Sequence, residues 1–109
     1  MALLKGTLDV LVLKTLSWGR MHGFEITSWL EERSDGRIGV TDAALLQALH
    51  RLEERGLLAA EWGVTRNGRR ARYYGLTAEG RATLREESAA LVDHAAALTA
   101  ILTARRAEP

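Results

Sequence analysis

The hydrophobic positions of residues 5–17 recur at helical spacing. Leu8, Leu11 and Leu16 fall on one stripe of this predicted helix, and Leu13 lies off it. A helix that is apolar on more than one side needs burial on more than one side. We therefore expect it to contribute to the domain core and also to an interface with a second subunit.

A second helix is predicted over residues 24–33, directly after the pair His22 and Gly23. Its hydrophobic residues are expected to face the core; they are Phe24, Ile26, Trp29 and Leu30. The turn-forming sequence Ser-Asp-Gly at 34–36 ends this helix. Residues 37–40 then have the composition of a short extended segment.

A third helix is predicted from about residue 42 to residue 55. Thr41 or Asp42 supplies its N-cap, and Gly56 suits the left-handed conformation that follows a last helical turn. At about 100° per residue the stripe that faces inward consists of Leu45, Ala48, Leu49 and Leu52. The second and third helices are joined by a short connection and predict a helix-turn-helix.

The hydrophobic period changes from helical to alternating after Gly56. Residues 57–64 alternate as a strand does, and Asn67-Gly68 is the strongest short signal for a hairpin turn. A two-residue turn at this pair would place Trp62 opposite Tyr73 across the two strands. We expect Trp62 to face inward and to fill part of the core, as Trp29 does.

The last predicted helix begins after Thr77 and runs from residue 78 to about residue 105. Leucines recur along it every seven residues, and a second series, partly of small residues, follows four residues later in each repeat. A domain this small cannot cover such a seam, so we expect the helix to pair with a second copy. The residues expected in the dimer interface are Leu4, Leu8, Leu11, Leu84, Leu91, Ala95, Leu98 and Leu102.

The order of these elements predicts a mainly α fold with a small β-hairpin. It is that of a winged helix-turn-helix followed by a long C-terminal dimerisation helix. A chain of 109 residues has room for one core, and so for one structural domain overall. Within it we expect residues 1–76 to form the winged helix-turn-helix and residues 77–109 the dimerisation helix and tail.

The net charge of +1 conceals a strong asymmetry. Residues 65–85 contain six arginines and one glutamate, a local charge of +5, so the remainder of the chain is acidic. Four of these arginines surround the predicted hairpin turn. The hydrophobic content of 47% is otherwise that of an ordinary globular protein.

A basic hairpin that follows a helix-turn-helix indicates double-stranded DNA as the partner. We expect the helix over 42–55 to enter the major groove and the wing over 65–72 to lie on the backbone or in the minor groove. The residues expected to contact DNA are Thr41, Asp42, Ala44, Leu46, Gln47, His50, Arg51, Arg66, Asn67, Arg69, Arg70 and Arg72.

Catalysis and metal binding are not indicated. The chain has no cysteine, and its three histidines, His22, His50 and His94, are widely separated. We expect no cofactor, no metal and no catalytic residue. The apolar run over residues 8–16 is too short to span a bilayer, so we expect no membrane contact and a cytoplasmic location.

Three motifs then resemble the PadR family of bacterial transcriptional regulators, in its short form with a single C-terminal helix. They are Met-His-Gly-Phe at 21–24, Leu-His-Arg-Leu-Glu at 49–53 and Tyr-Gly-Leu-Thr-Ala-Glu-Gly at 74–80. The resemblance implies a homodimeric repressor on an inverted-repeat operator, with the first and last helices forming the dimer. It also implies that a small aromatic ligand can bind between the subunits, where Trp18 is the candidate contact.

The chain departs from the family at the start of the third helix. Where the family commonly has Gly-Ser-Leu-Tyr-Pro, this sequence has Ala43-Ala44-Leu45-Leu46-Gln47. Two hydroxyls are thereby lost, while Gln47 gains an amide that can read adenine. The exposed Leu46 keeps open an alternative, a winged-helix protein-interaction module that has lost specific DNA binding. The salt dependence of binding separates the two functions.

Overall fold

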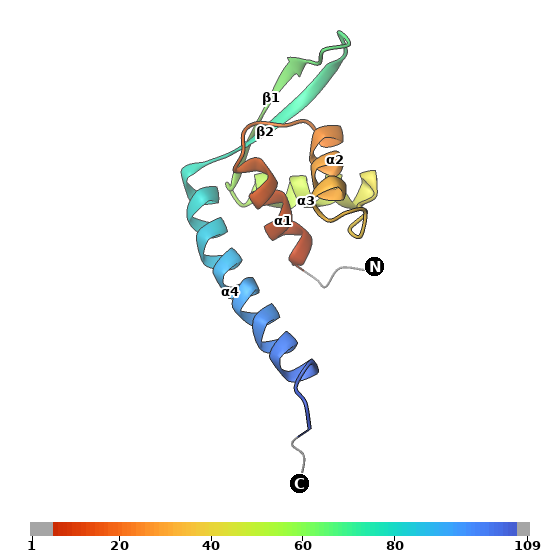
Figure 1. The fold of residues 1–109 in the computed structure, drawn as a ribbon. Helices are drawn as coiled ribbons and strands as arrows, with labels where there is room; N and C mark the ends of the chain where they lie inside the picture. The colour runs from red at the N-terminus through yellow and green to blue at the C-terminus, as the bar shows by residue number, and fades with distance from the viewer. Residues whose placement is uncertain (1–5, 107–109) are drawn as a thin grey trace.

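Three short helices form a cluster in the computed structural model, which describes residues 6–106 (Figure 1). A two-stranded antiparallel hairpin projects from one end of this cluster, and a long helix leaves in the other direction. The elements, in chain order, are α1 (Thr7–Leu16), α2 (Gly23–Arg33), α3 (Asp42–Glu54), β1 (Leu58–Val64), β2 (Arg70–Leu76) and α4 (Ala78–Leu102). The predicted fold class is confirmed.

The core lies where α1, α2 and α3 meet the base of the hairpin. The predicted inward stripe of α3 is buried along its whole length, from Leu45 to Leu52. Leu13 of α1 is fully buried as well, so the second apolar side of this helix also packs within the domain. Leu8 and Leu11 are only partly buried against the same core.

Side-chain caps fix where three of the helices begin. The hydroxyls of Thr41 and Thr77 each accept a hydrogen bond from the backbone N–H three residues further on, at 3.1 and 3.0 Å. His22 caps α2 by two hydrogen bonds. Its ring Nδ1 accepts from the backbone N–H of Glu25 at 3.4 Å, and the backbone N–H of His22 donates to the Glu25 carboxylate at 3.1 Å. Gly56 has a φ of 75° after the last turn of α3, as predicted.

The hairpin turn contains three residues instead of the predicted two. The N–H of Gly68 donates to the carbonyl of Thr65 at 2.9 Å, and Gly68 has a φ of 76°. A turn followed by a left-handed glycine is the usual three-residue connection. It moves the register by one residue, so Trp62 lies opposite Arg72 and not opposite Tyr73.

Two aromatic side chains that were expected to face inward are exposed. Phe24 lies on the side of α2 opposite to Ile26, and 77% of its surface is open. Trp62 lies on the part of the hairpin that projects past the helices, where there is no core to receive it, and is 59% exposed. Trp29 is partly buried against the core, as expected. Residues 37–40 connect α2 to α3 without joining a strand.

The long helix α4 begins in close contact with the rest of the domain. Gly80 is buried at its first turn, and a Cβ at this position would overlap the carbonyl oxygen of Leu57. Leu84 packs against the core one turn later. Further along, the helix extends past α1 into open space and ends at Leu102, three residues before its predicted end. Within residues 6–106, no helix has the length and hydropathy needed to cross a bilayer.

Candidate nucleic-acid interface

The outward side of α3 exposes mostly polar side chains. Gln47 and His50 are exposed on it, whereas Ala44 is partly buried. Thr41 and Asp42 mark the N-terminal end of the helix, which is also open to solvent. This end therefore has both the access and the hydrogen-bonding groups that readout of a nucleic-acid groove requires.

Arg51, which was expected to contact DNA, forms an ion pair inside the protein. Its Nη2 lies 2.7 Å from Oδ1 of Asp9 and its Nε lies 3.4 Å from Oδ2. Asp9 is only 9% exposed on α1. The hydrogen bond to this carboxylate raises the pKa of Arg51. The guanidinium is thus held against α1, where it neutralises a nearly buried charge.

The wing tip carries the unneutralised positive charge of the site. Arg66 and Arg69 are exposed beside Asn67, and within residues 6–106 neither forms an ion pair. The guanidinium of Arg70 stacks over the ring of Trp62, 4.5 Å from its centre. A cation held on an aromatic face keeps its charge and loses some of its conformational freedom.

Arg72 connects the base of the wing to α3. Its Nη2 lies 3.0 Å from Oε2 of Glu53, and its guanidinium lies 5.9 Å from the ring centre of Tyr74. Tyr74 is itself buried in the core, and this burial raises the pKa of its hydroxyl. The side chain expected to contact DNA here thus forms an ion pair between the base of the wing and α3.

Two adjoining hollows lie along the surface between α3 and the wing. The first, of about 440 Å³, lies between the start of α2, α3 and β2, and is lined by Asp42 and Leu46 among others. The second, of about 700 Å³, lies between the start of α2 and the wing loop. His22, Phe24 and Ala71 line both hollows. The exposed edge of α3 and the arginines of the wing therefore border one continuous concave surface.

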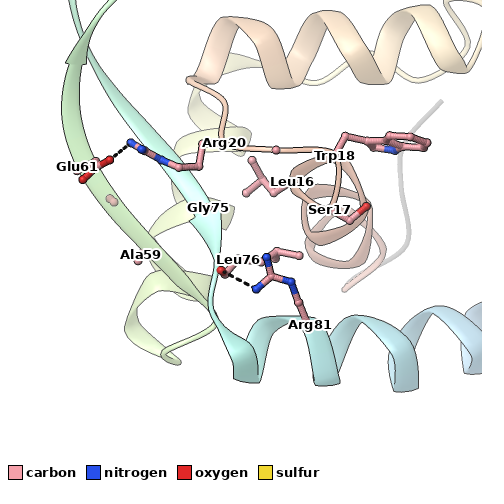
Figure 2. A pocket seen from close by; sticks show the side chains of 11 residues that line it. Leu16, Ser17, Trp18, Arg20, Ala59, Glu61, Gly75, Leu76 and Arg81 are labelled. Atoms are coloured by element: carbon pink, nitrogen blue, oxygen red, sulfur yellow. Dashed lines mark hydrogen bonds and ion pairs between the residues drawn. The ribbon is translucent and has the colours of Figure 1, made fainter.

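Trp18, the candidate ligand contact, lines a third hollow. This hollow, of about 430 Å³, lies between the α1–α2 connection, the base of the hairpin and the start of α4. Figure 2 shows Arg20 reaching across it to Glu61, while Arg81 points to the backbone carbonyl of Leu76. Trp18 lies at its margin, 65% exposed, and Lys14 lies 5.9 Å from its ring centre.

The residues expected in a dimer interface divide into two groups. Those near the domain, including Leu84 and Leu91, are partly buried within the single chain. Those further along α4 are exposed: Ala95 and Leu98, and then Leu102, which is 80% open. Leu4 lies outside the described residues.

Sequence reasoning missed several features of this surface, among them two ion pairs, Asp9–Arg51 and Glu53–Arg72. The Asp9–Arg51 pair had a signal, because a carboxylate inside the apolar stretch of a helix needs a partner of opposite charge. The stacking of Arg70 on Trp62 and the exposure of Phe24 had none that the hydrophobic pattern could supply. Within residues 6–106, no three acidic or histidine side chains gather in a way that could hold a metal.

A three-helix domain with an open third helix and a basic hairpin beside it belongs to the winged helix-turn-helix class of DNA-binding proteins. Residues 12–86 match the model of the PadR-like family of transcriptional regulators. This match spans well over half of the chain, and the chain therefore belongs to that family. Its members are transcriptional regulators.

Solved structures agree with this assignment. A PadR family transcriptional regulator from Eggerthella lenta is 30% identical, with a TM-score of 0.75 over 93% of this chain and 86% of that chain. A transcriptional regulator from Clostridium thermocellum is 23% identical, with a TM-score of 0.78 over 87% of this chain and 92% of that one. Bacillus subtilis PadR in complex with operator DNA is 19% identical, with a TM-score of 0.65 over 94% of this chain and 50% of that longer chain. The latter two share the fold.

Proposed function

We propose that this chain is a homodimeric repressor that binds an inverted-repeat operator. In this proposal α3 enters the major groove, and the tip of the wing lies on the neighbouring backbone or in the minor groove. The observation that carries the proposal is the continuous concave surface between α3 and the wing, whose outer edge bears arginines free of ion pairs within the described residues. The fold shared with Bacillus subtilis PadR, solved in complex with operator DNA, supports it.

The wing supplies affinity that does not depend on sequence. Arg66, Arg69 and Arg70 lie within five residues, and their guanidinium groups are open to solvent. A side chain that neutralises a phosphate releases a condensed counterion, which makes binding fall steeply as salt rises. The wing therefore holds the duplex, and base selection is left to α3.

Sequence selection is assigned to the N-terminal half of α3. Gln47 is exposed there, and its amide can form paired hydrogen bonds with the N6 and N7 atoms of adenine. Asp42, five residues earlier in the first turn of the helix, can accept from the N4 amino group of cytosine. Thr41 and His50 offer groups for the phosphates on either side. Arg51 and Arg72 take part indirectly, because carboxylates of the protein hold them.

A dimer is proposed through α4. The exposed leucines of its second half have nothing to pack against within the described part of a single chain. Pairing two copies would bury them and would place two α3 helices on one face of a duplex. Half-sites in such two-fold arrangements lie about one helical turn, or roughly 34 Å, apart.

Fluorescence anisotropy tests this function directly. A labelled duplex from the DNA upstream of the protein's own gene is titrated at two salt concentrations beside a scrambled duplex. We expect tight binding to the native duplex that weakens steeply with salt. Arg69→Ala should weaken both duplexes alike and lower the salt slope by about one. Arg105→Ala removes the same charge three residues after the end of α4, a helix that runs away from the hairpin (Figure 1). We expect this variant to change neither the affinity for the two duplexes nor the salt slope.

An alternative function is favoured by one feature, the apolar rim of the hollow beside α3. Leu46 and Phe24 are both exposed there, as side chains at a protein–protein interface would be. A winged-helix module that binds a protein through this rim would have no preference between the two duplexes, and its binding to the protein partner would depend little on salt. If neither duplex binds in the titration above, even at low salt, this module replaces the repressor.

A small aromatic ligand at the dimer interface remains part of the proposal. Trp18 is exposed beside the hollow at the start of α4, so a flat ligand could stack on its ring. Such a ligand should quench tryptophan fluorescence saturably, and Trp18→Phe should abolish that quenching. An unchanged signal over a panel of planar compounds would count against it.

A further inference from the structure

An apolar rim interrupts the polar surface between α3 and the wing. Leu46 is 50% exposed and Phe24 is 77% exposed, and both line the hollow between the start of α2, α3 and β2. The buried side chains of Leu45 and Leu49 form the wall behind them. This rim lies beside Gln47, the residue assigned above to base readout.

Packing within the domain does not account for the rim. Leu46 follows the buried Leu45, so it is rotated by about 100° away from the inward stripe of α3. Phe24 lies on the exposed side of α2, opposite to the buried Ile26. A single exposed leucine is ordinary. Two large apolar side chains that face one hollow, beside a cluster of arginines, indicate a partner with both negative charge and apolar groups.

The major groove of DNA offers such a combination. Its phosphates match the wing arginines, and among the base edges the C5 methyl of thymine is the apolar group that an aliphatic side chain can contact. Leu46 is the fifth residue of α3 and so belongs to the part of a recognition helix that touches base edges.

We infer that Leu46 and Phe24 form a contact site for thymine methyl groups in the operator. The inference rests on the proposed function and adds the chemical group that α3 selects. Gln47 stands next to Leu46 on the helix and reads adenine by hydrogen bonds. The two together favour neighbouring A·T pairs, one recognised by its adenine and the other by its thymine methyl.

Deoxyuridine tests the inference, because it differs from thymidine in that methyl alone. The probe is the tightest duplex that the full-length protein selects from a random library, with each thymine of both half-sites replaced by uracil, one position at a time. We expect binding to weaken about fourfold for each contacted methyl, which corresponds to about 0.8 kcal/mol for burial of one such group. Positions outside the contact should show no change.

Leu46→Ala is the matching variant. At the responsive positions Leu46→Ala and Phe24→Ala should each reduce the difference in affinity between the thymine and uracil duplexes. Gln47→Ala is the control: it should weaken binding and leave the ratio of thymine to uracil affinity unchanged. Both rim residues are exposed, so their variants should melt within about 2 °C of the parent, since surface substitutions change stability little.

The possible outcomes distinguish failure of the methyl contact from failure of the proposed DNA-binding function. Tight binding without any uracil effect overturns the methyl contact and leaves the repressor standing. A uracil effect that is undiminished in both Leu46→Ala and Phe24→Ala also overturns it, because a side chain outside the rim must then touch the methyl. If no duplex from the library binds even at low salt, the proposed function fails and the inference with it.

Discussion

Charged side chains near the interface have two different uses. Arg66 and Arg69 are open to a ligand, whereas Arg51 and Arg72 are held by carboxylates of the protein. The Asp9–Arg51 pair matters more for stability than the Glu53–Arg72 pair does. Asp9 is nearly buried, and Arg51 is its sole ion-pair partner within residues 6–106. Loss of Arg51 would leave a poorly solvated carboxylate at the junction of α1 and α3.

Arg51→Ala is therefore expected to reduce stability more than it reduces DNA binding. We expect a loss of about 1–2 kcal/mol in urea unfolding, below the cost of breaking a fully buried pair because Arg51 itself is half exposed. Arg55→Ala is the control. It breaks a pair with Glu87 at 3.6 Å in which both side chains are well exposed, and such pairs contribute about 0–1 kcal/mol. Equal losses in the two variants would contradict the role assigned to Asp9.

The ring of Trp62 supports the guanidinium of Arg70 on the wing. Trp62 is 59% exposed and lies 4.5 Å from the guanidinium, so its role is to orient that charge and not to fill the core. We expect Trp62→Ala to weaken operator binding about two- to fivefold, which matches a contact of about 0.5–1 kcal/mol. In Arg70→Ala the same change should have little further effect, since the two residues act as one unit.

Anisotropy titrations of the four proteins complete that cycle. Val64→Ala serves as the control, because Val64 is an exposed neighbour on the same strand face and opposes Arg70 without stacking on it. If the losses from Trp62→Ala and Arg70→Ala simply add, the ring does not position the guanidinium.

One glycine allows α4 to pack closely against the rest of the domain. Gly80 lies against the carbonyl of Leu57, where there is no space for a Cβ. We expect Gly80→Ala to cost more than about 2 kcal/mol, despite the better helix propensity of alanine, because backbone would have to move. Gly39→Ala, at a position with open space and an ordinary φ, should leave the melting temperature nearly unchanged. A thermal melt of each variant compares them, and similar melting temperatures would contradict this packing.

The hairpin illustrates what the hydrophobic pattern can and cannot define. Asn67-Gly68 correctly located the turn, because a glycine with positive φ is needed in both two- and three-residue connections. The hydrophobic pattern could not predict the number of residues in the loop. That number depends on contacts made elsewhere: a one-residue shift would exchange the faces of Tyr73 and Tyr74, and Tyr74 is the one buried in the core.

The threonine caps of α3 and α4 were predictable because they depend only on nearby residues. Thr41 and Thr77 bond to backbone only three residues away, so their sequence neighbourhood contains the whole interaction. The pairs Asp9–Arg51 and Glu53–Arg72 join residues that are 42 and 19 positions apart, and only the folded chain brings them together. The position of the basic wing therefore followed from sequence, while the division of its charges into free and paired did not.

The second half of α4 exposes large apolar side chains that a single chain leaves uncovered within the described residues. Leu98, Ile101 and Leu102 are 42%, 72% and 80% exposed, at the end of the helix furthest from the wing. Apolar area of this kind on a helix is typical of an interface that a second helix covers. We therefore expect association to depend on this segment and DNA affinity to depend on association.

Leu98→Glu should convert the proposed dimer to a monomer in sedimentation equilibrium, because two carboxylates would meet in an apolar seam. Ala100→Glu, an exposed position on the opposite side of the helix, carries the same new charge and should leave the dimer intact. Linking two half-site contacts raises effective concentration, so the monomer should bind the operator at least 100-fold more weakly. Its binding to a single half-site should be unchanged, because Leu98 lies near the end of α4, and this helix runs away from the hairpin (Figure 1). A Leu98→Glu protein that still sediments as a dimer would move the interface away from α4, to the partly buried face of α1.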